Sequence, residues 1–198
     1  DAYALFAGLL MGFLLLGPAL AMGLYDLSRR LGLGEQPRCL DTVAAWRPNL
    51  ANIGILAAVL GVLFLLWARA SMVGFALFFD TAGLPTFADV LRAIFAFEQP
   101  KFAVIYLGIA GLFAGLAFVI SVIALPMMLD RKVDAVNAAL ASIAACARNP
   151  AAMLVWVACI VSLITGSLVG GYVGLVVLMP WLGHASWHAY RDLTAKED

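Results

Sequence analysis

Long uncharged runs alternate along this chain with short segments that carry nearly all of its charged residues. A helix needs about 20 apolar residues to cross the hydrocarbon core of a bilayer. Runs of that kind predict membrane-spanning helices over residues 3–25, 50–70, 102–126, 151–168 and 172–190. The pattern therefore predicts an all-α membrane protein, with five transmembrane helices in the printed sequence.

The last two of these helices come from one uncharged run, residues 151–190, if both of its histidines are neutral. As a single helix this run would extend about 60 Å, roughly twice the hydrocarbon thickness, so it must fold back. Its only turn-like cluster consists of Gly166, Ser167, Gly170 and Gly171. We therefore expect a tight hairpin at these residues.

Short amphipathic segments follow the first three spans. Apolar side chains share one helical face, as is typical of helices that lie in the membrane interface, over residues 39–47, 87–98 and 133–148. Thr86 and Asp89 have the spacing of a capping box, which satisfies free amides at a helix start. A proline, which is well tolerated in the first turn of a helix, then opens each following span: Pro48, Pro100 and Pro150.

The distribution of charge predicts the orientation. Arginine and lysine concentrate in the loops after the first and third spans and in the C-terminal tail, whereas the loop after the second span is acidic. Basic loops of membrane proteins usually face the cytoplasm, so we expect a cytoplasmic C-terminus. The first span would then begin outside, and because the chain starts at Asp1 without a charged leader or cleavage site, we expect that a further helix precedes it.

Composition agrees with this interpretation. Hydrophobic residues make up 65% of the 198 residues, charged residues only 12%, and the mean hydropathy is +1.02. Soluble domains are roughly one quarter charged, so the bilayer is the solvent that suits this chain. Lys+Arg and Asp+Glu balance at 12 each, which offers no positive excess to recruit nucleic acid. Three widely spaced cysteines favour reduced thiols over a disulfide framework.

Polar side chains are expected to gather where the spans meet the cytoplasmic boundary. The candidate cluster comprises Asp26, Arg29, Arg30, Asp130, Arg131, His184, His188, Tyr190 and Arg191. His184 and His188 are four residues apart, so a helix projects both imidazoles from one face, where they could bind zinc, copper or haem. The neighbouring Trp181, Trp187 and Tyr190 suggest an interfacial aromatic belt and favour structural hydrogen bonding instead. Proton handling is a third interpretation, and we predict no metal or cofactor.

Arg69 is the charge that lies nearest to a predicted span. If the helix ends at Arg69, its side chain can extend to the outer interface, which is the favoured interpretation. If the helix continues through Ser71 to Phe79, Arg69 lies deeper and needs a partner, because an intramembrane charge is a functional hypothesis by default.

Closely spaced small residues predict where helices pack. The pairs are Gly8/Gly12, Gly111/Gly115, Gly166/Gly170 and Gly170/Gly174. Such pairs let two helices approach closely, and we favour packing within this chain. Pro18, Pro126 and Pro180 lie near the cytoplasmic ends of spans, where they should kink the helices.

No catalytic motif is present. The sequence lacks a GxGxxG, a P-loop, a nucleophile elbow and an HExxH, and no ionisable residue lies in the middle of a predicted span. These absences predict that the protein is not an enzyme and argue against an ion-coupled pump.

Five short motifs resemble one known family. They are Gly23–Arg30, Ala45–Arg47, Leu125–Ala135, Arg148–Pro150 and Leu182–Leu193. Together they are similar, over essentially the whole chain, to the bacterial inner-membrane proteins catalogued as domain of unknown function 2189. Some members are labelled cytochrome c oxidase subunit I-like. The resemblance implies a six-helix bacterial protein with no established activity, of which this chain begins at the second helix.

Three functions remain open at this stage. The favoured one is a non-catalytic accessory or assembly subunit that packs against a larger membrane complex, respiratory or otherwise energy-transducing. The alternatives are a small-molecule or lipid transporter or lipid-handling protein, and a haem- or metal-binding protein that uses His184 and His188. The expected surroundings are the lipid bilayer and other membrane subunits, without nucleic acid.

Overall fold

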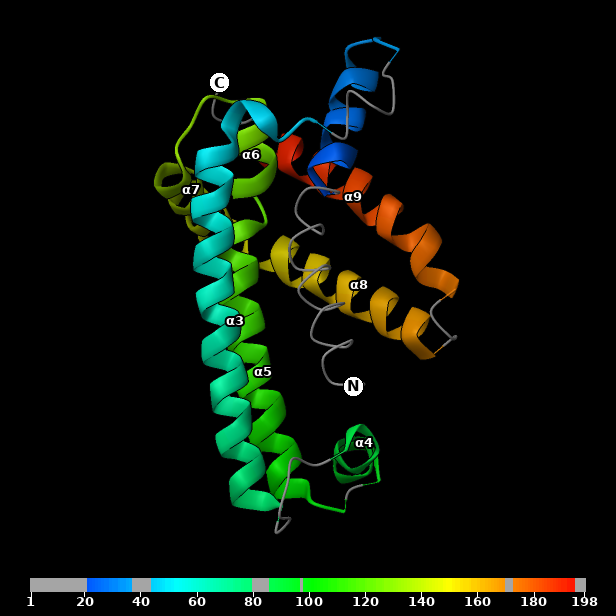
Figure 1. Ribbon diagram of the computed structural model, residues 1–198. Helices are drawn as coiled ribbons and strands as arrows, with labels where there is room; N and C mark the ends of the chain where they lie inside the picture. The colour runs from blue at the N-terminus through cyan, green and yellow to red at the C-terminus, as the bar shows by residue number, and fades with distance from the viewer. Residues whose placement is uncertain (1–20, 37–43, 80–85, 97, 170–172, 195–198) are drawn as a thin grey trace. The chain divides into compact units, whose positions relative to one another are not determined.

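The computed structural model describes residues 21–36, 44–79, 86–96, 98–169 and 173–194. All regular elements in these ranges are helical (Figure 1), which confirms the predicted all-α class. The predicted hairpin residues Gly170 and Gly171, most of the first predicted span and most of the segment 39–47 lie outside the described residues.

Three helices in the described part of the chain are long and apolar enough to cross a membrane. They cover Arg47–Phe78, Pro100–Asp130 and Pro150–Ser167. A lipid core offers no hydrogen-bond partners to the backbone, so a helix, which satisfies its own amides and carbonyls, is the structure that such apolar runs adopt. The protein is an all-α membrane protein. The number and limits of its passes stay predictions.

The chain divides into two compact units. Unit 1 comprises Asp1–Leu56 and Ile120–Asp198, and unit 2 comprises Ala57–Val119. Unit 2 contains most of α3 (Leu50–Phe78), the whole of α4 (Phe87–Phe95) and most of α5 (Pro100–Ser121). Unit 1 contains α6 (Ala124–Asp130), α7 (Ala135–Arg148), α8 (Pro150–Val169) and α9 (Val173–Thr194).

An aromatic cluster joins α3 and α5 in unit 2. Phe102 is only 1% exposed, and its ring lies 5.0 Å from that of Phe79 and 5.2 Å from that of Tyr106, centroid to centroid. Phe75 stacks on Tyr106 at 5.5 Å. Ring separations of this size are favourable beyond simple burial, so these contacts hold the end of α3 against the start of α5.

Helix α4 begins with the predicted capping box. The Thr86 hydroxyl accepts a hydrogen bond from the Asp89 amide at 3.2 Å, and Asp89 Oδ2 accepts one from the Thr86 amide at 2.9 Å. Two amides that a helix start leaves unpaired are thereby satisfied, which explains why the helix begins at Phe87.

Helix α3 does not end at Arg69. It continues to Phe78, so the favoured expectation, a span terminated by Arg69, is wrong for the helix itself. A single arginine does not interrupt an α-helix, and the residues from Ala70 to Phe78 are apolar or small. Arg69 therefore lies about 14 Å before the end of its helix, measured along the axis.

A break separates α5 from α6 at Val122 and Ile123. Pro126 has no amide proton to donate to the carbonyl of Val122, and its ring crowds that carbonyl. The amide of Ile123 is released from the helix and donates instead to the Ser142 hydroxyl on α7 at 3.1 Å. The kink predicted at Pro126 is thus present four residues earlier, and Ser142 satisfies an amide that the break frees.

Helix α7 has two contrasting faces. Its buried face is made of small residues, Ala135, Ala138, Ser142 and Cys146. Its apolar residues Val136, Leu140 and Ile143 are 65%, 57% and 41% exposed and lie on the opposite side. Small residues allow α7 to approach α6 closely, while the larger side chains remain available to lipid.

Proline begins two of the helices, and an asparagine fixes the start of a third. Helices α5 and α8 begin at Pro100 and Pro150, as the sequence predicts. Ahead of α3, the Asn49 amide group donates to the carbonyls of Met128 and Val133 at 3.1 and 3.2 Å. Asn49 therefore ties the start of α3 to the end of α6 inside unit 1.

Candidate functional site

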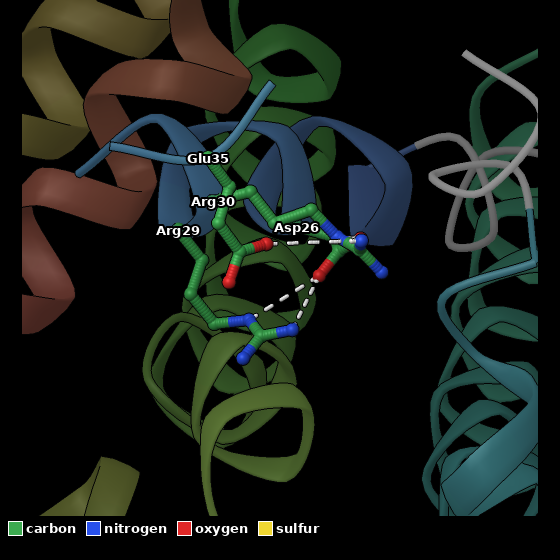
Figure 2. Close-up of polar contacts among 4 residues, drawn as sticks. All are labelled: Asp26, Arg29, Arg30 and Glu35. Carbon is green, nitrogen blue, oxygen red and sulfur yellow. Dashed lines mark hydrogen bonds and ion pairs between the residues drawn. The ribbon is translucent and has the colours of Figure 1, made fainter. Parts of the chain in front are cut away.

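Asp26 is the centre of a buried ion-pair group in the helix over residues 21–32 (Figure 2). It is 1% exposed, and each of its carboxylate oxygens has its own guanidinium. Oδ1 accepts from Arg29 at 2.7 and 3.2 Å, and Oδ2 accepts from Nε of Arg30 at 2.8 Å. Arg30 Nη1 also lies 3.9 Å from Glu35 Oε2. Arg29 and Arg30 thus balance the two carboxylates of Asp26 and Glu35, and the buried Asp26 charge is fully paired.

Asp130 and Tyr190 form a second polar contact of the predicted cluster. The Tyr190 hydroxyl donates to Asp130 Oδ2 at 2.9 Å. Tyr190 is 1% exposed, as is Trp187, whose ring centroid lies 5.5 Å away. The expectation of an interfacial belt is therefore wrong for Trp187 and Tyr190, because both rings are buried inside unit 1. Trp181, at 55% exposed, is available to the bilayer.

His184 is hydrogen-bonded through Nδ1 to the Ser28 hydroxyl, which joins α9 to the helix over residues 21–32. His188 is exposed. Across the part of the chain that the structure describes, no three His, Cys, Asp or Glu side chains come together as metal ligands do. The Ser28 contact fits structural hydrogen bonding by His184, which stays a prediction.

Two cavities adjoin the cluster. The larger, about 260 Å³, is lined by Arg29, Leu33, Asp130, Arg131, Trp187, Arg191 and Thr194. The smaller, about 160 Å³, lies beside Asp26, Arg29, Arg30 and Asn49. The structure thus brings Asp26 to Arg30, and it brings Asp130, Arg131 and Arg191 to one cavity. His188 lines neither cavity.

Sequence reasoning places Arg29 in the polar cluster but misses Ser28 and Gly183. Ser28 lies in the motif Gly23–Arg30, but nothing in the sequence pairs it with a residue on α9. Gly183 was also missed as a packing position: a Cβ there would lie 2.5 Å from Leu24 Cδ1. Spacing within one helix is visible in a sequence, whereas contacts between distant helices are not.

The predicted packing glycines behave in two ways. A Cβ at Gly174 would meet the Ser167 hydroxyl at 2.7 Å, so α8 and α9 approach closely there, as packing within the chain requires. A Cβ at Gly111, Gly115 or Gly166 would have no neighbour within 4 Å among the residues that the structure describes. Gly8, Gly12 and Gly170 lie outside the described residues.

Arg69 belongs to unit 2, and its side chain is exposed. Among the described residues of that unit, no carboxylate lies within salt-bridge distance of it. Arg69 and the polar cluster thus belong to different units of the chain.

One family model matches this sequence. It is described as "predicted integral membrane protein (DUF2189)", and it covers residues 5–130, more than half of the chain. The chain belongs to this family. The matched region ends at Asp130, so it does not extend over the whole chain as the resemblance implied, and it leaves out the motif at residues 182–193. No curated protein and no solved structure matches.

Proposed function

We propose that this DUF2189 protein is a non-catalytic accessory or assembly subunit, which packs against a larger complex in the bacterial inner membrane with its C-terminus in the cytoplasm. An exposed face of α3 carries the proposal. It consists of Ala58, Gly61, Leu65, Arg69 and Met72, whose spacing of three and four residues aligns them along one side of the helix. All five are exposed.

The small residues of this face suit another helix better than lipid. A Cβ at Gly61 would have no neighbour within 4 Å in the described part of the chain, so none of those residues uses the close approach that this glycine permits. Helices in a bilayer gain stability from close packing at small residues, since lipid tails solvate large apolar side chains equally well. Helix α5 offers the same feature, because Gly108, Gly111 and Gly115 are exposed with open space beside each.

Arg69 indicates which chemical group the partner should carry. On an apolar helix an arginine is costly unless an acidic or carbonyl group meets it. Its place in line with Gly61 and Leu65 supports a partner helix that packs on the small residues and presents a carboxylate at the level of Arg69. Such a partner would be a second membrane protein.

The experiment is a gentle purification of the tagged full-length protein from its own membranes, followed by mass spectrometry. We expect a defined set of membrane subunits in fixed ratio to the bait. Gly61→Phe and Arg69→Leu should each reduce that set by about tenfold, which corresponds to the loss of about 1.4 kcal/mol of binding free energy.

The matched control is Val59→Phe. Val59 is 44% exposed and lies two residues from Gly61, so it points to another face of α3. The Val59→Phe substitution should leave the set of recovered subunits unchanged. Recovery of this polypeptide alone, or equal losses in Gly61→Phe and Val59→Phe, would contradict the proposal.

A further inference from the structure

The cavity beside Asp130 and Trp187 in unit 1 is lined by arginines from three separate segments. Arg29 comes from the helix over residues 21–32, Arg131 directly follows α6, and Arg191 lies in the last turn of α9. All three residues line one space of about 260 Å³. Each arginine follows a predicted span, so by sequence all three belong to the same membrane boundary.

The charge of the lining is unbalanced. Among the described residues that line the cavity, Asp130 alone carries a carboxylate, and Asp130 already accepts a hydrogen bond from Tyr190 at 2.9 Å. Arg29 donates to Asp26, which lies outside the lining, through Nε and Nη2. Because Asp26 pairs with Arg29, Arg131 and Arg191 are left with Asp130, and the lining keeps one excess positive charge. An anion that enters this cavity would compensate it.

Arg191 forms no salt bridge with a carboxylate of the described residues. Its guanidinium nevertheless has a defined place: a Cβ added to Gly32 would lie 3.7 Å from Nη1. The side chain therefore reaches from α9 over the end of the neighbouring helix, towards the cavity that Arg29 lines.

The rim of the cavity is apolar as well as basic. Leu33 belongs to the lining and is 63% exposed, and the buried ring of Trp187 contributes on the α9 side. A soluble anion gains nothing from an exposed leucine beside its site. A phospholipid does, because its glycerol and acyl portions continue from the phosphate into apolar surroundings.

We propose that this cavity binds the phosphate group of an anionic phospholipid, with Arg29, Arg131 and Arg191 as its ligands. Guanidinium groups present paired donors that match phosphate oxygens, and basic pockets at the ends of transmembrane helices are suited to lipid head groups. This assignment does not depend on the accessory role proposed above.

A simpler account of the arginines is that they neutralise the partial negative charge at three helix C-termini. That role needs only nearby positive charge, and it predicts no preference for one lipid head group over another. The two accounts therefore differ in a measurable way.

The test uses the purified full-length protein in a mild detergent. Equal amounts of phosphatidylglycerol and phosphatidylcholine are added, and the lipids retained by the protein are counted by native mass spectrometry. We expect phosphatidylglycerol to be retained about tenfold more than phosphatidylcholine, a preference that should fall with added salt. Arg191→Gln should remove most of this preference, and it breaks no salt bridge among the described residues.

Lys132→Gln is the matched control, because Lys132 is exposed, adjoins Arg131 and lies outside the lining, while the change in charge is the same. The Lys132→Gln variant should keep the preference for phosphatidylglycerol. The melting temperatures of Arg191→Gln and Lys132→Gln should both match that of the wild type. Equal retention of the two lipids, or equal effects of Arg191→Gln and Lys132→Gln, would overturn the proposal. Displacement of the lipid by glycerophosphate or inorganic phosphate at comparable concentration would assign the cavity to a soluble phosphate compound instead.

Discussion

The hydroxyl of Tyr190 donates a hydrogen bond to the carboxylate of Asp130, with 2.9 Å between the two oxygens. The contact joins the last turns of α9 and α6, and it lies beside the cavity that Arg131 and Arg191 share. Tyr190 is buried whereas Asp130 is exposed, so the tyrosine is the fixed partner and the aspartate is held in place by it.

Removal of the Tyr190 hydroxyl should destabilise the contact between α9 and α6. Hydrogen bonds to charged groups contribute about 1.5–3 kcal/mol, and we expect Tyr190→Phe to cost about 1.5 kcal/mol because Asp130 is exposed to solvent. Thermal unfolding in detergent measures the change. Tyr106→Phe is the control, since the Tyr106 ring stacks in unit 2 but its hydroxyl forms no hydrogen bond with the described residues. Equal melting temperatures for the two variants would refute the contribution of the Asp130 contact.

Loss of the Asp26 charge should have a larger effect. Removal of one member of a buried ion pair costs about 3–5 kcal/mol. Arg29 and Arg30 are 33% and 30% exposed at their side chains, so water offsets part of that cost. We expect Asp26→Asn to lower the free energy of unfolding by about 2 kcal/mol.

The control for Asp26 is Asp192→Asn. Asp192 is exposed and belongs to no salt bridge among the described residues, so its substitution should leave the free energy of unfolding within about 0.5 kcal/mol of the wild type. A loss of equal size in both variants would show that the net charge matters and that the ion-pair group does not.

Local patterns in the sequence were sufficient for the fold class and for two features of its helices. Uncharged runs predict helices because lipid leaves the backbone no other way to satisfy its hydrogen bonds. The capping box of Thr86 and Asp89 follows from a spacing of three residues, and the break before α6 follows from the missing amide proton of Pro126.

Features that depend on contacts between distant segments could not be predicted. The partners Ser28 and His184 are 156 residues apart, and no periodicity relates them. The continuation of α3 past Arg69 was open for another reason: a single charge is compatible both with the end of a helix and with its interior. Burial of Trp187 and Tyr190 likewise depends on which face of α9 meets the rest of unit 1, which a sequence of aromatic residues does not specify.

The start of α7 should depend on pH. Asp134 accepts hydrogen bonds from the amides of Asn137 and Val136 at 2.9 and 3.0 Å and from the Asn137 side chain at 2.6 Å. The contacts with Asn137 lower the pKa of the Asp134 carboxyl below its usual value. A carboxyl whose pKa is lower in the folded state stabilises that state above the unfolded pKa, about 3.9, and this stabilisation is lost as the pH falls through the folded pKa.

Two variants test this cap. Asp134→Ala should melt at a lower temperature than the wild type at neutral pH, and the difference should shrink as the pH falls below about 4. Asparagine also caps helices but carries no charge, so Asp134→Asn should keep much of the stability without the pH dependence. A difference between the wild type and Asp134→Ala that stays constant over the whole range would exclude the carboxylate as its source.

Close packing of Gly183 against Leu24 gives the sharpest prediction about how unit 1 is assembled. A Cβ at Gly183 would lie 2.5 Å from Leu24 Cδ1 and 2.9 Å from Leu24 Cβ. A change of rotamer can move Cδ1 but not Cβ, so the helix over residues 21–32 would have to shift away from α9. Overpacking of this kind costs about 1–3 kcal/mol, which exceeds the gain of up to about 1 kcal/mol that alanine brings over glycine in a helix.

Gly183→Ala should therefore lower the melting temperature, and it should weaken the contact between Ser28 and His184, which joins the same two helices. Gly111→Ala is the matched control, because a Cβ at Gly111 has no neighbour within 4 Å. It should raise the melting temperature slightly or leave it unchanged. If both variants are stabilised alike, Leu24 does not pack on Gly183, and the arrangement of the two helices beside the three-arginine cavity must differ from the one described.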